Sequence, residues 1–246
     1  MTTKSPSPWF DRAFDSLYAD LYAHRDDGEA RQLVRTLAER FPLVGPVLDI
    51  ACGTGRLLAP LSGAFAGAVG IDRSPALLRR AREREGGHAL VRGDMRELPF
   101  AAGAFGAAVS LFTSFGYFDR EAEDRAVLAE AARVLTRHGR FVLDYLNPGP
   151  TVAHLIPRSS RIVGDREVEE RRWLDESGPF LRKEVRVAGD PPVVYQERVR
   201  LYEPDRLVAQ LSACGLEVRD RWGGYQGQEY AAEQSARLIL LAERRP

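Results

Sequence analysis

VLDIACGTGR, residues 47–56, is the stretch of sequence that decides the fold. It predicts an apolar strand that runs through a glycine loop into a helix starting at about Arg56. Glycine at positions 53 and 55 lets the backbone turn tightly and approach a ligand with no Cβ in the way. The start of the helix directs unpaired N–H groups and the positive end of its dipole toward the same point. The stretch therefore predicts a binding site for a small molecule that carries a negative group.

The composition is that of an ordinary globular chain of 246 residues. The 35 basic and 35 acidic residues cancel, which argues against a nucleic-acid partner, although a local patch for an RNA substrate stays open. No apolar run approaches the roughly 20 residues of a membrane span. Residues 1–8 are polar and contain proline, so we expect a disordered tail there and no signal peptide. The cysteines, Cys52 and Cys214, are expected to be reduced, which suits a cytoplasmic protein.

Strand and helix patterns alternate along the first two thirds of the chain. Residues 9–41 have helical periodicity with a break at Asp26-Asp27-Gly28. The alternation that follows predicts right-handed βαβ units, and therefore an α/β fold with a parallel sheet covered by helices on both faces. The predicted strands are 47–50, 68–71, 89–91, 107–111 and 140–146, and the predicted helices are 56–61, 74–85 and 120–135.

The pattern changes between Pro148 and Tyr202, where Val, Arg, Glu and aromatic residues predominate. Three stretches, 161–173, 180–187 and 193–202, predict an antiparallel meander of three strands. A helix at 203–214 and strands at 216–222 and 236–243 follow. We therefore expect a core made of residues 9–147 and 203–246. Residues 148–202 are expected to form an insertion that serves as a lid, a substrate wall or a dimer interface.

Asp72 closes the second predicted strand and narrows the choice of ligand. A carboxylate at this place can accept both hydroxyls of a ribose, as in nicotinamide-dependent enzymes. However, Leu58 stands where the dinucleotide fingerprint has its third glycine, and Asp49 puts a negative charge where a pyrophosphate would lie. A cofactor with a carboxylate, an ammonium group and a ribose suits these residues better.

Four motifs, in order and at family spacing, resemble those of the class I S-adenosylmethionine-dependent methyltransferases. They are VLDIACGTG (47–55), GIDRSP (70–75), RGDMRELPF (92–100) and VSLFTSFGYF (109–118). The resemblance covers residues 47–146 and extends more loosely to both ends. It implies a Rossmann-like, doubly wound sheet of seven strands whose last strand, 236–244, runs antiparallel.

The resemblance also implies a set of cofactor-binding residues. Asp49 and the backbone of Ala51–Gly55, which includes Cys52, Gly53 and Gly55, would hold the methionyl group of S-adenosylmethionine. Asp72, next to Arg73, would hold the ribose. Asp94 would accept from the adenine amino group while the Met95 N–H meets the ring, and Leu111 and Phe112 would lie against the methyl donor. Capping or turn roles for Asp49, Asp72 and Asp94 are the alternative.

The N-terminal helix carries further candidates for the cofactor site. Tyr18, Tyr22 and Arg25 recur at near-helical spacing. In similar enzymes this segment folds over the cofactor, and an arginine there can form a forked pair with its carboxylate. Tyrosines in the core and a solvated arginine are the alternative.

The substrate side of the site is less well defined by sequence. Residues 110–118, SLFTSFGYF, lack the Asn/Asp-Pro-Pro-Tyr/Phe run of enzymes that methylate bases or glutamine. The aromatic residues there could wall a pocket or belong to the core. The candidates for substrate contact are Phe115, Tyr117, Tyr145, Asn147 and Tyr225. His154 and Tyr117 are the candidates for a base, and no histidine has a partner at metal-ligand spacing.

These features favour transfer of a methyl group from S-adenosylmethionine to nitrogen or oxygen of a small molecule, leaving S-adenosylhomocysteine. The transfer is an in-line displacement in which alignment of the acceptor can suffice without a dedicated base. A nicotinamide-dependent oxidoreductase and a non-catalytic S-adenosylmethionine-binding protein are the alternatives from other classes. An RNA or protein acceptor also stays open, and the chain is expected to be a monomer or a homodimer.

Overall fold

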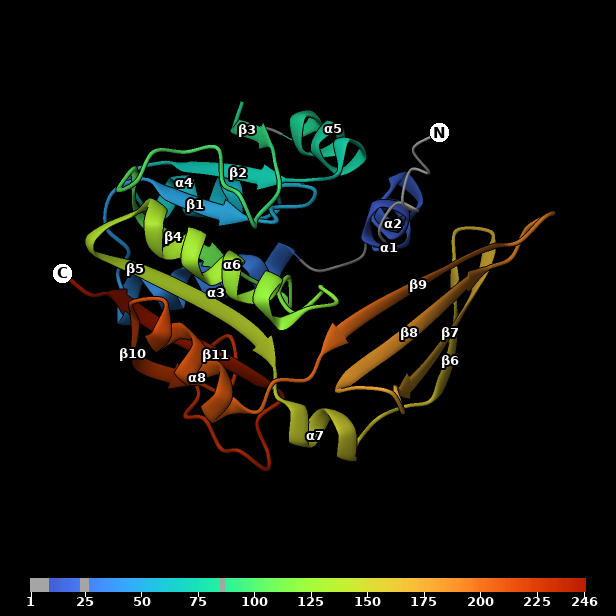
Figure 1. Ribbon diagram of the computed structural model, residues 1–246. Coiled ribbons are helices and arrows are strands. Elements are labelled where there is room, and N and C mark those ends of the chain that lie inside the picture. Colours follow the sequence, from blue (N-terminus) through green and yellow to red (C-terminus); the bar gives the residue numbers. More distant parts are fainter. Residues whose placement is uncertain (1–8, 23–26, 85–86) are drawn as a thin grey trace, which may run out of the picture.

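The computed structural model describes residues 9–22, 27–84 and 87–246, and its centre is a seven-stranded sheet (Figure 1). The strand order is β10-β11-β5-β4-β1-β2-β3. Neighbouring strands from β3 to β5 are parallel, and β11 is antiparallel to both β5 and β10. The predicted seven-stranded α/β sheet with an antiparallel last strand is thus confirmed. Its strands are β1 (Val47–Ile50), β2 (Ala68–Asp72), β3 (Ala89–Arg92), β4 (Phe105–Ser110), β5 (Leu135–Leu146), β10 (Leu216–Trp222) and β11 (Arg237–Arg244).

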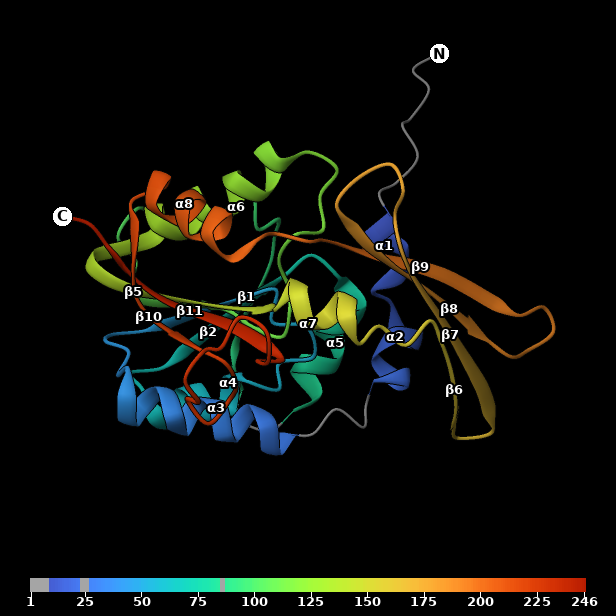
Figure 2. The ribbon, with the colours of Figure 1, turned by 90° about the horizontal axis from the view of Figure 1, so that it is seen from below.

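Helices cover both faces of this sheet (Figure 2). On one face α3 (Asp27–Arg40) and α4 (Leu58–Ala64) bury their leucines against β1, β4 and β11. On the other face α6 (Glu121–Val134) and α8 (Pro204–Ala213) pack against β4 and β5. Because both faces are covered, β1 is buried along its whole length, Asp49 included. A buried carboxylate in a central strand needs a partner, and that need defines the site described below.

The helix after β2 begins where its sequence predicts. α5 (Pro75–Glu83) has Ser74 as its N-cap, and the Ser74 hydroxyl accepts from the N–H of Leu77 at 3.2 Å. Proline at the first position fits because its missing N–H would be unsatisfied there anyway. This sharp turn from strand to helix leaves Asp72 at the carboxyl edge of the sheet.

The insertion consists of α7 (Pro148–Ala153) and a separate antiparallel sheet of four strands. The prediction of three strands is wrong at its first strand, because Gly164 and Asp165 form a two-residue hairpin turn inside residues 161–173. Gly164 has a φ of +62° there, a conformation that glycine adopts at no steric cost. The strands are β6 (Arg158–Val163), β7 (Arg166–Leu174), β8 (Phe180–Val187) and β9 (Val193–Arg200).

Two short N-terminal helices, α1 (Trp9–Ala13) and α2 (Ser16–Leu21), lie between the core and the insertion (Figures 1 and 2). Leu17, Leu21 and Tyr22 pack against the valines on one face of the insertion sheet. On the core side, Arg80 of α5 pairs with Asp20 at 2.5 Å. The predicted tail, residues 1–8, lies outside the described residues. Within the described part of the chain, no helix is both long and apolar enough to cross a membrane.

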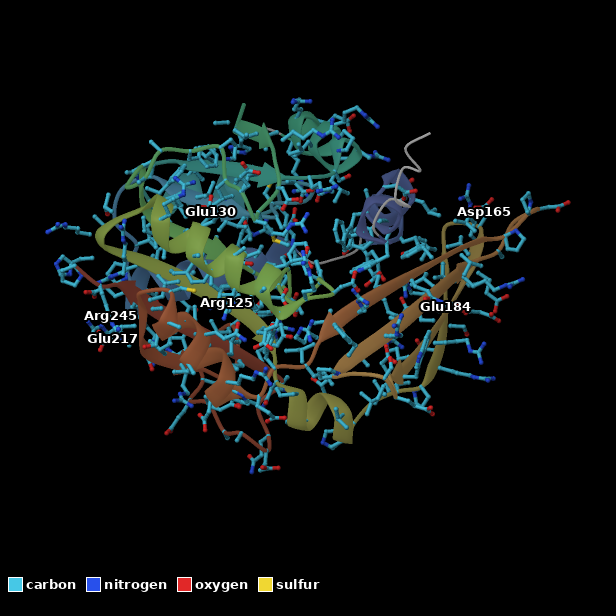
Figure 3. The ribbon with its side chains drawn as sticks, viewed as in Figure 1. Arg125, Glu130, Asp165, Glu184, Glu217 and Arg245 are labelled. Carbon is cyan, nitrogen blue, oxygen red and sulfur yellow. The ribbon has the colours of Figure 1, made fainter. Side chains whose placement is uncertain are left out.

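Charged side chains spread over the core and the insertion alike (Figure 3). Asp165 marks the β6–β7 turn, and Arg245 lies 3.9 Å from Glu217 near the C-terminus. This dispersal agrees with the balanced charge of the chain, and such exposed pairs contribute little to stability.

Candidate functional site

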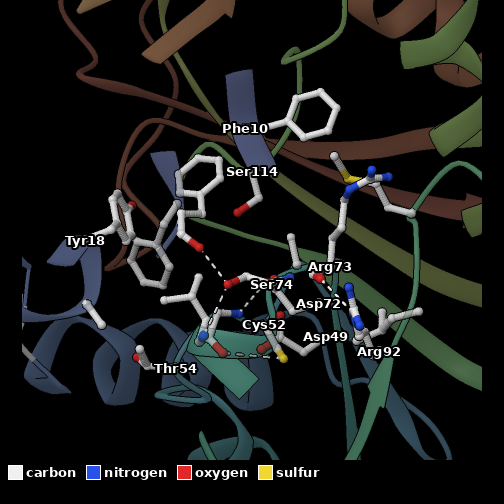
Figure 4. A pocket seen from close by; sticks show the side chains of 18 of the residues that line it. Phe10, Tyr18, Asp49, Cys52, Thr54, Asp72, Arg73, Ser74, Arg92 and Ser114 are labelled. Carbon is white, nitrogen blue, oxygen red and sulfur yellow. Dashed lines mark hydrogen bonds between the residues drawn. The ribbon is translucent and has the colours of Figure 1, made fainter. Parts of the chain in front are cut away.

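A cavity of about 720 Å³ opens at the carboxyl ends of β1, β2 and β4, under α1 and α2 (Figure 4). This is the edge of a doubly wound sheet at which ligands bind. All of its lining residues fall between positions 10 and 118. They come from the N-terminal helices and from the segments that follow β1, β2, β3 and β4. Most of the residues expected from the sequence line this cavity. They are Tyr18, Tyr22, Asp49, Ala51, Cys52, Gly53, Asp72, Arg73, Asp94, Met95, Leu111, Phe112 and Tyr117.

The loop after β1 takes the strained shape that its glycines allow. Ala51, Gly53 and Gly55 all have positive φ, at 61°, 56° and 74°. A Cβ built on Gly53 would meet nothing within 4 Å, so the backbone itself faces the cavity there. Gly55 instead packs close to Ala81 of α5 and does not line the cavity. The loop thus presents bare backbone to a ligand.

Asp49 is 2% exposed, and its Oδ2 atom has no hydrogen-bond partner among the described residues. Burial, with the nearby charge of Asp72 adding to it, raises the pKa of the Asp49 carboxyl to about 8, while the charge of Arg56 acts in the opposite direction. A buried carboxyl without a hydrogen-bond partner is costly to ionise unless a cation joins it. An ammonium group is the matching ligand.

Arg56 lines the cavity and was assigned no role from the sequence. Its guanidinium lies 3.5 Å from the centre of the Phe112 ring, a cation–π geometry. A charged residue immediately after the last glycine, in the turn before α4, is the signal that could have identified it; α4 begins at Leu58, two residues later than predicted. Arg25, the arginine expected to take a cofactor carboxylate, lies outside the described residues.

Asp72 connects the glycine loop to α5. Its Oδ2 accepts from the N–H of Gly53 at 2.9 Å, and its Oδ1 accepts from the N–H of Ser74 at 2.8 Å. Burial raises the pKa of Asp72, and these backbone hydrogen bonds act against the rise. A carboxylate has about four lone-pair positions, so both oxygens can also accept from a ligand diol. Asp72 therefore shapes the loop and faces the cavity at the same time (Figure 4).

Asp94 lies at the far end of the cavity and is held by two arginines. Arg73 approaches Oδ2 at 2.6 Å, and Arg96 donates to both oxygens from its side chain and to Oδ1 from its backbone. Burial would raise the pKa of Asp94, but the hydrogen bonds and charge of Arg96, with the charge of Arg73, hold it below its usual value. Asp94 is thus an ionised acceptor whose partners compete with any ligand.

An aromatic wall closes the cavity on the side of the N-terminal helices. It is formed by Phe10, Phe14, Tyr18 and Tyr22, which recur every four residues. This regular spacing is a signal that could have predicted the wall, although the helix breaks at Phe14 and Asp15, between α1 and α2. The Phe14 carbonyl accepts from the Ser74 hydroxyl at 2.6 Å, which fixes the wall to the start of α5 (Figure 4).

The segment after β4 forms the opposite wall through Leu111, Phe112, Ser114 and Tyr117. The Tyr117 hydroxyl donates to the carbonyl of Thr113 at 2.6 Å. Its ring lies 5.6 Å from that of Phe14, so the two walls meet. Ser114 is a further cavity residue that the sequence did not single out.

The other residues expected to contact substrate lie away from the cavity. Phe115 and Tyr145 are core residues, 1% and 0% exposed. Asn147 donates to the carbonyls of Ala232 and Ser235, both at 2.8 Å, and so fixes a loop. Their side chains do not line the cavity because they point into the protein interior.

Tyr225 and His154 are also absent from the cavity wall. The Tyr225 ring lies behind the wall, 5.4 Å from the ring of Phe112. His154 is exposed at the C-terminal end of α7. No histidine lines the cavity in the part of the chain that the structure describes. Among the described residues there is also no cluster of potential metal ligands.

The residues present fit the cofactor that the sequence resemblance implies. The orphaned Asp49 oxygen suits an ammonium, Arg56 suits a carboxylate, Asp72 suits a diol, and the bare loop at Gly53 leaves room for close approach. A pyrophosphate would lie against the Asp49 side chain, and the cavity composition therefore disfavours a dinucleotide.

Comparison with known proteins agrees with this geometry. Residues 47–139 match a family described as a methyltransferase domain. A dTDP-3-amino-3,6-dideoxy-alpha-D-glucopyranose N,N-dimethyltransferase from Streptomyces fradiae is 30% identical over 213 residues, 83% of this chain and 82% of that protein. A dTDP-3-amino-3,4,6-trideoxy-alpha-D-glucopyranose N,N-dimethyltransferase from Streptomyces venezuelae is 35% identical over 212 residues, 81% of this chain and 87% of that protein.

A solved structure is similar over the whole length. The sugar N-methyltransferase KedS8 from Streptoalloteichus sp ATCC 53650 superposes with a TM-score of 0.74 at 25% identity. The superposition covers 100% of this chain and 99% of that one, so the likeness includes the insertion as well as the core.

Proposed function

The chain belongs to the class I S-adenosylmethionine-dependent methyltransferases, and we propose that it methylates the amino nitrogen of a nucleotide-linked amino sugar. The family assignment decides the cofactor in favour of S-adenosylmethionine over a nicotinamide. The proposed acceptor is supported by two relatives, each 30% or more identical and each matching about four fifths of the chain, since both are named for dTDP-linked amino sugars.

We assign the cofactor contacts from the geometry of the cavity. Asp49 would take the ammonium of the methionyl group, and Arg56 its carboxylate. Asp72 would accept from the ribose hydroxyls. Asp94 and Met95 would hold the adenine, which requires that the partly exposed Arg73, at 42% side-chain exposure, yield one hydrogen bond. Tyr18 and Tyr22 would close the site from above.

The single observation that carries nitrogen as the acceptor atom is that both of these relatives are named as N,N-dimethyltransferases. When bound, the cofactor supplies an activated methyl group on a sulfonium. A neutral amine can attack such a group directly, so the protein needs only to align it and exclude water. The aromatic walls at Phe14 and Tyr117 exclude water, and the Ser114 hydroxyl offers a hydrogen-bond partner for the acceptor.

The test is an assay of purified protein with S-adenosylmethionine and dTDP-3-amino-3,6-dideoxyglucose, followed by mass spectrometry. We expect the acceptor to gain one methyl group and then a second, with matching formation of S-adenosylhomocysteine. Absence of methylated product from a folded protein that binds S-adenosylmethionine would rule out this acceptor class.

A further inference from the structure

The segment that follows β4 and forms one wall of the cavity has an unusual backbone conformation. Phe112 and Thr113 are consecutive residues with positive φ, 58° and 63°. Bulky and β-branched side chains rarely adopt this conformation, and it persists only where surrounding contacts enforce it. Both residues lie between the end of β4 and the cavity. The contacts that hold their backbone conformation therefore also determine the position of this cavity wall.

Those contacts come from one ion pair between β5 and β11, formed by the fully buried Asp144 and by Arg237, whose side chain is 21% exposed. Asp144 is 0% exposed, and Arg237 approaches its Oδ1 from Nε at 2.8 Å and from Nη2 at 2.7 Å. The two residues are offset by two positions in the strand register, since Asp144 pairs with Ile239 and Arg237 with Leu146. Neither residue lines the cavity.

Asp144 and Arg237 reach the wall segment through three hydrogen bonds, and Tyr225 adds a fourth bond to Asp144 from behind the wall. The N–H of Phe112 donates to Asp144 Oδ2 at 2.7 Å, and the N–H of Thr113 donates to the Asp144 carbonyl at 3.1 Å. Arg237 Nη2 donates to the Thr113 hydroxyl at 2.8 Å. The Tyr225 hydroxyl donates to Asp144 Oδ2 at 3.2 Å while its ring supports Phe112 from behind.

We infer that Asp144 and Arg237 are positioning residues for methyl transfer, acting by holding Phe112 and Thr113 in the left-handed conformation. This conformation turns the Phe112 ring under the Arg56 guanidinium and sends the chain on to Ser114 and Tyr117. A loosened segment would leave the cofactor contacts of Asp49 and Asp72 in place and would cost Arg56 only its cation–π contact, but it would misalign the acceptor. The inference rests on the proposed function in one respect, that the acceptor reaches the methyl group beside this segment.

The test compares Arg237→Met with Arg133→Met. Arg133 is a matched control because it also joins a carboxylate, Glu130, and two carbonyls, those of Leu98 and Phe100, but none of these four residues lines the cavity. We expect Arg237→Met to lower kcat about tenfold to a hundredfold, as small misplacements do, while the Kd for S-adenosylmethionine stays within about threefold. Arg133→Met should lower the melting temperature and leave kcat near that of the wild type.

Two further variants test the positioning role if Arg237→Met folds poorly. Thr113→Ala leaves the ion pair intact but removes its side-chain link to the segment, and should lower kcat by a smaller factor. Arg237→Lys, which keeps the charge, should recover part of the loss. Equal losses of kcat in the Arg237 and Arg133 variants, or a loss confined to the acceptor KM, would overturn the positioning role.

Amide hydrogen exchange separates failure of this inference from failure of the proposed acceptor. We expect the amides of Phe112 and Thr113 to be protected in the wild type and to exchange faster in Arg237→Met. If the wild type methylates no amino-sugar nucleotide, the proposed acceptor fails while this exchange comparison still decides the inference. Unchanged protection in Arg237→Met would contradict it.

Discussion

Asp49 couples cofactor binding to pH. Its carboxyl has a pKa of about 8 in the protein, so it is protonated at neutral pH before the ligand arrives. An ammonium beside it favours the ionised form, and binding below pH 8 therefore releases a proton. The affinity for S-adenosylmethionine should rise by up to about tenfold per pH unit toward pH 8, then fall as the cofactor's own amino group, with a pKa of roughly 8, loses its proton.

The measurement is calorimetric titration from pH 6 to pH 8 in buffers of different ionisation enthalpy, which counts the protons released. Asp49→Asn is the control, and its weaker binding should not rise with pH and should release no proton. A wild-type affinity that does not change over this range would show that Asp49 does not face the ammonium.

Asp72 should contribute more to affinity than any exposed acid near the site. Asp72→Ala removes the proposed acceptor of two ribose hydroxyls, each a hydrogen bond to a charged group, and should raise the Kd about tenfold to a thousandfold. Asp20→Ala is the matched control, because Asp20 is an exposed acid of α2 that pairs with Arg80. Equal effects of the two substitutions in direct binding measurements would refute the assignment.

Some residues of the site could be predicted from the sequence and others could not. Asp49 and Asp72 could be picked out because they lie in, or at the end of, predicted strands of a parallel sheet, while the role of Asp94 came from the family resemblance. The sequence could not predict that Phe112 and Tyr117 line the cavity while Phe115 lies in the core. It depends on the left-handed turn at Phe112 and Thr113, which breaks the two-residue alternation of a strand.

The insertion sheet contacts the N-terminal helices and does not line the cavity. Lys183 of β8 donates to the Tyr22 hydroxyl at 2.7 Å and pairs with Glu197 at 2.8 Å. Arg161 lies 5.4 Å from the centre of the Tyr22 ring. We infer that the insertion holds Tyr22, and with it the aromatic wall, over the cofactor.

Lys183→Met tests this link between elements. The substitution removes the donor to Tyr22 and leaves the Glu197 carboxylate without its cation, so we expect the Kd for S-adenosylmethionine to rise about threefold to tenfold. Arg182→Met is the control, because the neighbouring side chain points to the other face of β8 and pairs with Asp175 at 2.6 Å. A change of the Kd that is the same in both variants would indicate a general weakening of the sheet.

The elements themselves were predictable to different degrees. The central strands and helices were read correctly because buried parallel strands and amphipathic helices have distinct periods. β6 and β7 were merged because residues 161–173 are rich in β-forming residues on both sides of a turn of only two residues. Such a turn leaves hardly any trace in composition, although its glycine is a hairpin signal.

At the scale of the whole molecule, the residues that line the cavity and the residues that support it come from different parts of the sequence. Residues 10–118 line the cavity, and residues from the second half support it through Asp144, Lys183 and Arg237. Long-range contacts of this kind have no local pattern. This is why the cofactor site could be predicted from sequence and its supporting residues could not.

The cavity composition predicts selectivity for the acceptor atom. A hydroxyl acceptor needs a base to remove its proton, and the described cavity residues include no histidine. We therefore expect the 3-hydroxy analogue of the amino-sugar nucleotide to be methylated at least about a hundredfold more slowly than the amine. Competition between the two acceptors in one reaction, followed by mass spectrometry, gives the ratio directly, and comparable rates would indicate that a carboxylate or a tyrosine of the cavity acts as the base.

The most direct test of the account is a crystal structure of the protein with S-adenosylhomocysteine. We predict the methionyl ammonium at Asp49, the carboxylate at Arg56, the ribose hydroxyls at Asp72 and the adenine between Asp94 and Met95, all beneath Tyr18 and Tyr22. A ligand bound outside this cavity, or inside it with the ribose away from Asp72, would contradict the assignment of the site.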